Sequence, residues 1–85
     1  MKIIYSSKFA HEYKRLPDKI KIIAEKKELI FRNNPFDPSL ETHKLHGKLD
    51  EFWSFSIDYK YRIVFEFIES DLVHFHSVGD HSVYR

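Results

Sequence analysis

Residues 53–78 read WSFSIDYKYRIVFEFIESDLVHFHSV, and this stretch decides the fold. Apolar and polar side chains alternate along it in three runs. The first ends at Ile57, the second begins at Tyr61, and the third contains Val73 and Phe75. Alternation with a period of two, interrupted by short polar segments, is typical of β-strands joined by tight turns. The stretch therefore predicts three strands in an antiparallel meander.

The register of these strands follows from their aromatic side chains, which are buried together only if all of them face the same way. That condition makes residues 58–60 an odd-length turn or a bulge, so that Ile57 opposes Tyr61, and it places Phe67 opposite Val73. The other face of the sheet is then expected to be polar and open. It gathers Ser54, Ser56, Arg62, Val64, Glu66, His74 and His76.

The first part of the chain carries helical patterns. Residues 2–5 form a short β-rich run, and Ser6 after it suits a helix N-cap. Apolar side chains then recur at helical spacing over residues 8–16 and again over residues 18–33, with Pro17 between the two segments. We expect a hairpin of two helices with one buried face.

Residues 36–51 show no regular period, and we interpret them as a long connecting loop. The whole pattern predicts an α+β fold in a single domain, residues 1–85. In this fold a short N-terminal strand and the two-helix hairpin pack on a twisted, mainly antiparallel four-stranded sheet.

Composition excludes several classes of protein. The chain has no cysteine, so disulfides and thiolate metal sites are ruled out, and no apolar run approaches the roughly 18 residues of a membrane span. We expect a cytoplasmic protein that does not cross a membrane. Residues 1–34 contain nine Lys and Arg against four Asp and Glu, which fits a polyanion-binding surface and equally a solvated helical face.

The residues suited to chemistry lie in the second half of the chain. Arg62 is predicted in the middle strand of the meander, where its permanent charge would either pair with Glu66 or be held for an anionic ligand such as a phosphate. His81 follows the Gly79–Asp80 turn, and an imidazole suits acid or base work near neutral pH. Tyr84 could anchor the chain end or offer its hydroxyl to a phosphate.

His43 and Lys44 in the long loop could add a proton-transfer group and a phosphate contact, or be solvated. His74, His76 and His81 could imitate a zinc site, but no acidic residue except Glu66 has suitable spacing, so no metal site is predicted. Glycine-rich phosphate loops, Gly-x-Ser-x-Gly elbows and cysteine nucleophiles are absent from the sequence. The remaining chemistry is acid–base catalysis on a phosphodiester, with arginine stabilising charge.

Motifs along nearly the whole chain resemble those of the RelE/ParE toxin superfamily, the toxin halves of bacterial type II toxin–antitoxin systems. The ending is most similar to the YafQ-like and YoeB-like branches. The resemblance implies a compact fold that enters the ribosomal A site, cuts mRNA there, and is held inactive by a cognate antitoxin. It rests on Ser-x-x-Phe and Leu-Pro at residues 6–9 and 16–17, and on residues 34–36, 43–47, 52–54, 61–65 and 79–84.

Residue by residue, the resemblance implies that Arg62 stabilises the transition state and that His81 is the catalytic histidine, with Tyr84 and His43 as further catalytic groups. Ser56 and Lys60 stand where YafQ-like enzymes place a histidine and an aspartate. The base of the YoeB-like branch has its nearest counterpart at Glu41, so the general base is not assigned. The expected RNA-binding residues are Lys44, Ser54, Ser56, Lys60, His76, Lys19, Lys26 and Lys27.

The sequence thus leads to the hypothesis of a metal-independent, ribosome-dependent mRNA endoribonuclease that needs no cofactor. The 2′-hydroxyl would attack the adjacent phosphate and leave a 2′,3′-cyclic phosphate. Its expected partners are an antitoxin protein, mRNA and the 16S rRNA of the ribosome, with the toxin either monomeric or in a hetero-oligomer with its antitoxin. Two alternatives remain: a ParE-like inhibitor of DNA gyrase, and a degenerate toxin that only binds an antitoxin.

Overall fold

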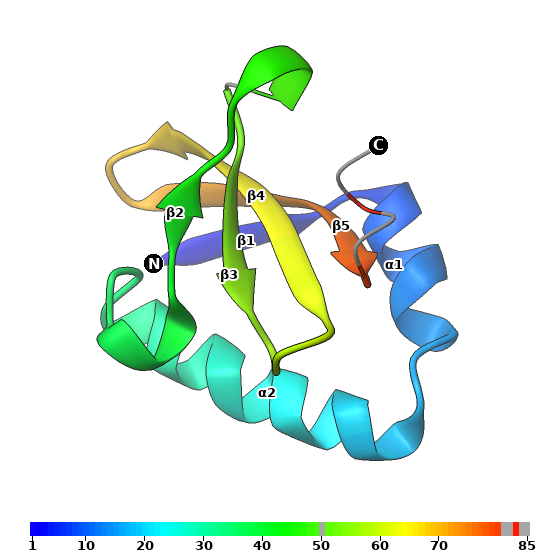
Figure 1. Ribbon diagram of the computed structural model, residues 1–85. Coiled ribbons are helices and arrows are strands. Elements are labelled where there is room, and N and C mark those ends of the chain that lie inside the picture. The colour runs from blue at the N-terminus through cyan, green and yellow to red at the C-terminus, as the bar shows by residue number, and fades with distance from the viewer. Residues whose placement is uncertain (50, 81–82, 84–85) are drawn as a thin grey trace.

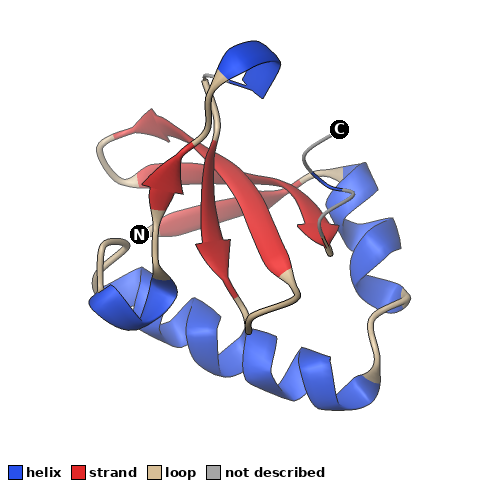
Figure 2. Ribbon diagram, in the orientation of Figure 1, coloured by secondary structure: helices blue, strands red, loops and turns tan. Residues whose placement is uncertain are grey.

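The computed structural model describes residues 1–49, 51–80 and 83, and it has the predicted α+β architecture (Figure 1). Two helices lie along one side of a twisted sheet, with the longer one beneath it and the shorter one beside the last strand (Figure 2). The elements in chain order are β1 (Lys2–Tyr5), α1 (Ser7–Lys14), α2 (Asp18–Asn33), η1 (Pro38–Leu40), β2 (His43–Lys44), η2 (Gly47–Leu49), β3 (Trp53–Ser56), β4 (Arg62–Glu69) and β5 (Leu72–Gly79).

The sheet has the strand order β1-β5-β4-β3-β2, in which β1 runs parallel to β5 and the other pairs are antiparallel. The described residues therefore form five strands where four were predicted. The additional strand is β2, whose residues His43 and Lys44 pair with Ser54 and Trp53. A strand of two residues has no period that a sequence pattern could reveal, which is why it was assigned to the loop.

The predicted register is confirmed on both sides of β4. The Ile57 amide donates to the Tyr61 carbonyl at 2.9 Å, and Phe67 is the partner of Val73. The turn between β3 and β4 is held by Asp58, whose Oδ1 accepts from the Tyr61 amide at 2.7 Å. An aspartate carboxylate that binds nearby backbone amides stabilises a tight turn. This turn determines which side chains of β4 face the helices.

A β-bulge at His76 changes the faces of the second half of β5. Phe65 pairs with Phe75, but Val64 pairs with Ser77, so His76 is an extra residue in the ladder. Strict alternation from Val73 and Phe75 would put Val78 on the polar face, but it points into the core opposite Ile63, and Ser77 takes the polar face. That part of the predicted alternation was wrong because a bulge adds one residue to one strand only.

The core lies between α2 and the sheet and is built around Phe31. Its side chain has no exposed surface, and its ring centroid lies 4.8 Å from that of Phe55, 4.9 Å from Phe65 and 5.5 Å from Phe75. Aromatic pairs at these separations add to the free energy gained from burying their area. Aromatic side chains thus supply the area that a small chain needs for a stable core.

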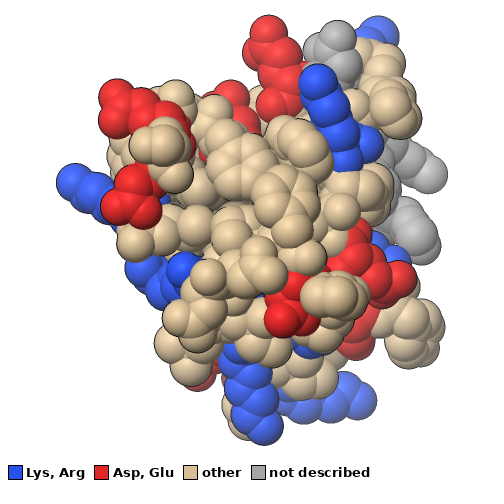
Figure 3. Space-filling view, turned by 90° about the vertical axis from the view of Figure 1, so that its left-hand side faces the viewer, with Lys and Arg blue, Asp and Glu red and all other residues tan. Residues whose placement is uncertain are grey.

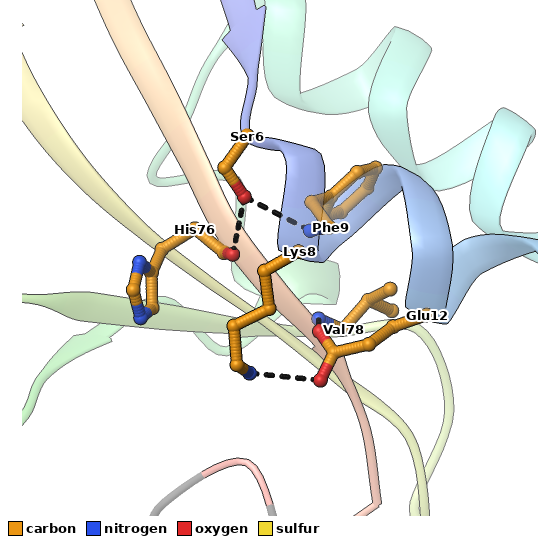
Figure 4. Close-up of polar contacts among 6 residues, drawn as sticks. All are labelled: Ser6, Lys8, Phe9, Glu12, His76 and Val78. Carbon is orange, nitrogen blue, oxygen red and sulfur yellow. Dashed lines mark hydrogen bonds and ion pairs between the residues drawn. The ribbon is translucent and has the colours of Figure 1, made fainter.

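Beyond the end of β1, helix α1 and its N-cap lie along the edge of β5 and bind its backbone (Figure 4). Ser6 caps the helix, since its Oγ accepts from the Phe9 amide at 2.9 Å, and the same hydroxyl donates to the His76 carbonyl at 2.7 Å. One turn later, Glu12 Oε1 accepts from the Val78 amide at 3.0 Å. Side chains of the helix therefore satisfy backbone groups that a neighbouring strand would otherwise bind.

Candidate functional site

The candidate site lies on the face of the sheet that points away from α2. A row of side chains crosses the middle of this face, because partners in a ladder point the same way: Ser54 of β3, Val64 of β4 and Ser77 of β5. His43 of β2 continues the row at the edge of the sheet. Ser54, Val64 and Ser77 have no exposed surface.

A second, smaller apolar cluster covers this row. It consists of Leu45, Val64 and Val83, with Phe52 packed against them. The prediction of an open polar face is therefore wrong at its centre. Leu45 follows β2, where its amide donates to the Phe52 carbonyl at 2.9 Å, and Val83 lies beyond the last strand. Both come from segments outside the meander, so the alternation of the strands could not reveal them.

Arg62 lies at one end of the face, in a row with Ser56 and Gly79. Its Nη1 donates to the carbonyl of Tyr61 at 3.1 Å and to the carbonyl of Asp58. The proposed pairing with Glu66 is wrong, because Glu66 Oε1 binds His74 Nδ1 at 3.2 Å. Carbonyl oxygens orient the guanidinium fork and leave its full positive charge in place.

Glu41 reaches the same end of the sheet from the segment after η1. The Ser56 hydroxyl donates to Glu41 Oε1 at 3.4 Å, and Ser56 is the cross-strand partner of Arg62. The Glu41 backbone is left-handed, with φ of 52°, and its carbonyl contacts His43 Nδ1 at 3.0 Å. Glu41 thus reaches β3 at Ser56, the partner of Arg62, while His43 lies beside β3 at Ser54.

An open hollow of about 340 Å³ borders this end of the site. Gly79 at the end of β5 and Asp80 after it line the hollow together with Tyr61, Glu12 of α1 and the helix C-cap Arg15. Groups of both signs therefore face one small space beside the row that contains Arg62.

The other end of the face contains His74, His76 and Phe52. The His76 ring centroid lies 4.8 Å from that of Phe52, and burial lowers the pKa of His76 below its usual value. Electrostatic interactions with Lys8 and His74 lower this pKa further. Figure 4 places Lys8 between His76 and Glu12. Lys8 Nζ lies 2.8 Å from Glu12 Oε2. We expect a neutral, acceptor-capable imidazole here at pH 7.

Lys8 and Glu12 were not singled out from the sequence. Their spacing of four residues on α1 is visible in it, but which way they face depends on how α1 docks against β5. Nothing local in the sequence specifies that docking.

The structure does not bring all the predicted RNA-binding residues together. Lys44 is the partner of Trp53, so it lies on the helix side of the sheet, away from Ser54 and His43. Lys60 Nζ lies over the ring of Tyr61, 5.4 Å from its centroid. Ser54 and Ser56 are buried, and the Ser56 hydroxyl is used on Glu41.

The predicted lysines of α2 lie on the helical side of the molecule, across the sheet from Arg62. Lys19 and Lys26 are exposed, whereas Lys27 Nζ donates to the Ser39 carbonyl at 3.0 Å and ties α2 to η1. His81 and Tyr84 lie outside the described residues. Among the residues that the structure does describe, no three His, Cys, Asp or Glu side chains gather to hold a metal ion, and no helix is long and apolar enough to cross a membrane.

The fold is similar to that of several solved bacterial toxins. The YoeB/ParE toxin from Agrobacterium tumefaciens matches with a TM-score of 0.80 at 18% identity, over 95% of this chain and 99% of that one. In the YoeB-YefM complex from Staphylococcus aureus the TM-score is 0.76 at 18% identity, over 95% and 97%. YafQ from E. coli strain BL21(DE3) gives 0.72 at 19% identity, over 96% and 94%.

The similarity is one of structure rather than of sequence. No protein-family model and no curated protein sequence matches the chain. The three solved structures nevertheless match over nearly their full lengths. This chain therefore has the fold of the YoeB/ParE and YafQ toxins, as its motifs implied.

Proposed function

We propose that the chain is the toxin of a type II toxin–antitoxin pair and acts as a metal-independent, ribosome-dependent mRNA endoribonuclease. The observation that carries the proposal is the placement of Arg62. Its guanidinium is held by backbone carbonyls at the end of the helix-free face, in the row of Ser56, and the Glu41 carboxylate binds Ser56 from the other side.

In the proposed reaction the RNA 2′-oxygen forms a bond to the adjacent phosphorus, and the bond from phosphorus to the 5′-oxygen breaks. Glu41 would accept the proton of the 2′-hydroxyl, and His81 would donate one to the leaving 5′-oxygen. Arg62 would neutralise the charge that develops on the phosphate, commonly the largest single contribution in such a step. The products are a 2′,3′-cyclic phosphate and a 5′-hydroxyl.

The ribosome would complete the site by aligning the attacking group with the phosphate. Exposed lysines on α2, among them Lys19 and Lys26, would contact ribosomal RNA through phosphates, so binding should weaken as salt increases. Lys60 would contact the mRNA strand, and His43 and Tyr84 would act as further catalytic groups.

We propose an antitoxin as the regulatory partner. The support is that similar folds were solved in such assemblies: the E. coli DinJ-YafQ toxin-antitoxin complex matches with a TM-score of 0.68 at 20% identity, over 95% of this chain and 92% of that one. An antitoxin that covers the end of β3 would bury Arg62 and Glu41 together.

The test is primer extension on a translated mRNA with purified protein and ribosomes. Wild type should cut within the codon of the A site, and only when ribosomes are present. Arg62→Ala should lower the rate constant of cleavage by about 100- to 1,000-fold, the usual effect of removing a group that stabilises an oxyanion. Glu41→Gln and His81→Ala should each lower it by about 100-fold or more.

Lys2→Ala is the control, because Lys2 is an exposed cation in β1, at the edge of the sheet opposite to β2, and has no part in the proposed chemistry. It should cut like wild type. In cells, Arg62→Ala and His81→Ala should each relieve growth arrest while the protein keeps its fold by circular dichroism. Full toxicity of both variants would refute the nuclease, and DNA breaks with intact transcripts would point to gyrase instead.

A further inference from the structure

The helix-bearing face of the sheet has an end that α2 does not cover. Trp53 and Phe67 belong to this face, because their partners Phe65 and Val73 are in the core. Helix α2 ends at Asn33, and Phe36 from the following segment lies against both rings. The core therefore continues to the surface beside the β4–β5 turn.

Three aromatic rings form the floor of an open hollow of about 490 Å³ at this place. The centroid of Phe36 lies 5.5 Å from that of Trp53 and 5.9 Å from that of Phe67, and Trp53 and Phe67 are 5.6 Å apart. Ile68, Glu69 and Ser70 complete the lining, and we name these six residues the aromatic patch.

Large apolar side chains of the aromatic patch are exposed to solvent, which is unfavourable for such side chains. Phe36 is 54% exposed, Ile68 49% and Phe67 36%. A register shift between Phe67 and Glu69 leaves Ile68 outside the ladder, where a bulge commonly re-aims a side chain. Figure 3 views the molecule from this side and shows a broad uncharged area with charged side chains at its margins. Contiguous apolar surface of this kind marks interaction sites.

The charge around the patch selects the kind of partner. Residues 66–72, which include the β4–β5 turn, contain three acids, Glu66, Glu69 and Asp71, and no Lys or Arg. Glu69 lines the hollow itself, whereas Glu66 is engaged by His74 and Asp71 by the N-terminal amine. Lys44 is the basic neighbour, as the cross-strand partner of Trp53 on the β2 side. The side of the patch toward the β4–β5 turn is therefore acidic.

We propose that the aromatic patch docks a peptide segment of a protein partner, which inserts an aromatic or aliphatic anchor among Phe36, Trp53 and Phe67 and places Lys or Arg against Glu69. Aromatic-lined pockets that exclude water supply most of the binding free energy in such contacts. RNA is disfavoured, because base stacking on aromatic rings is normally accompanied by cationic contacts to phosphates, and the turn side offers a carboxylate. The patch lies across the sheet from Arg62, so docking there is separate from the proposed nuclease site.

Trp53 makes the proposal directly measurable, because it is the only tryptophan of the chain. The probe is an acetylated and amidated peptide, Lys-Lys-Phe-Leu-Lys-Lys, titrated into the full chain while the emission of Trp53 is recorded. We expect a saturable blue shift as the indole loses water. The peptides Glu-Glu-Phe-Leu-Glu-Glu and Lys-Lys-Ala-Ala-Lys-Lys should each bind at least about fivefold more weakly, because one loses the charge match and the other the anchor.

Two charge variants separate the roles of the patch residues. Glu69→Lys should weaken the basic peptide by about fivefold, and Lys44→Glu should strengthen it, because the two changes alter the local charge in opposite directions. Phe36→Ala should weaken binding about tenfold through loss of apolar contact, and since Phe36 is 54% exposed the fold should persist by circular dichroism. Glu25→Lys on the exposed side of α2 is the matched control and should bind like wild type.

Several results would overturn the proposal. If the peptide Lys-Lys-Ala-Ala-Lys-Lys bound as tightly as the basic aromatic peptide, the proposed apolar anchor would be refuted. If the emission of Trp53 did not change at saturating peptide, the proposed binding site would be refuted. A decamer of uridine that shifts the emission more strongly than the basic peptide would assign the patch to nucleic acid. A shift that depends on protein concentration without peptide would assign it to a second copy of the chain. None of these readouts depends on RNA cleavage.

Discussion

The fold changes the ionisation of His76, a residue of β5. Burial lowers its pKa, and Lys8 and His74 lower it further, while Glu66 and Glu12 act in the opposite direction. In the unfolded chain the imidazole titrates near its ordinary value of about 6.5. Between that value and the lower folded pKa, the unfolded state binds more protons than the folded state. Stability therefore rises with pH through this window and is fully present above it.

We predict that the melting temperature of wild type decreases as the pH is lowered from 7 toward 5, and that His76→Gln makes this decrease shallower. The glutamine keeps a polar side chain beside Phe52 but cannot take up a proton. His11→Gln is the control, because His11 is exposed on α1. Thermal unfolding followed by circular dichroism at several pH values measures the slopes, and identical slopes for wild type and His76→Gln would contradict the assignment.

At the scale of elements, the junction of β1 and α1 depends on the hydroxyl of Ser6, which binds the Phe9 amide and the His76 carbonyl. Ser6→Ala should lower the free energy of unfolding by about 1–2 kcal/mol, because it removes an N-cap and leaves a carbonyl without its partner. Urea denaturation measures the change. Ser7→Ala removes a similar hydroxyl from an exposed position and should be nearly neutral.

The end of β5 and the segment after it are coupled through Gly79. A Cβ at this position would lie 2.9 Å from Val83 Cγ1, closer than carbon atoms pack. Gly79→Ala should therefore destabilise the chain by displacing Val83 from Leu45 and Val64. In the double variant with Val83→Ala, the methyl group introduced at position 79 has room. The loss of unfolding free energy in the double variant should therefore be smaller than the sum of the two single losses by about 0.5–3 kcal/mol. Strict additivity in urea denaturation would show that the two residues do not meet.

For the whole molecule, the decisive contact is that of Phe31 with the rings of the sheet. Phe31→Ala should cost about 3–5 kcal/mol through lost burial and a cavity. A small domain has only about 5–15 kcal/mol in total, so the cooperative unfolding transition should move to much lower denaturant or disappear. Phe36→Ala is the matched control, because it truncates the same residue type at a 54% exposed position and should leave most of the stability.

How far the sequence predicts this fold depends on whether a feature is local. The pairings of Ile57 with Tyr61 and of Phe67 with Val73 followed from alternation, and the helix boundary at Pro17 followed from its missing amide. The bulge at His76 was not predictable, because the position of an extra residue depends on how two strands meet. Strand β2 was too short to carry a period.

The candidate site divides in the same way. That Arg62 lies on the helix-free face was predictable from parity, but its carbonyl partners, and the choice of Glu66 for His74, depend on the turn at Asp58 and on the pairing of β4 with β5. The burial of Ser54 was missed because Leu45 and Val83 cover it from segments distant in the sequence. Such contacts leave no local pattern.

The parallel pairing of β1 with β5 constrains when the chain can finish folding during its own synthesis. Lys2 pairs with Leu72, and Tyr5 pairs with Phe75. Strand β1 therefore cannot form its hydrogen bonds until β5 has been synthesised. Until those later residues leave the exit tunnel, the nascent segment has no ladder to join, and closing so long a loop is slow. A newly made copy therefore cannot be assembled while it is still attached to the ribosome that is making residues 72–79.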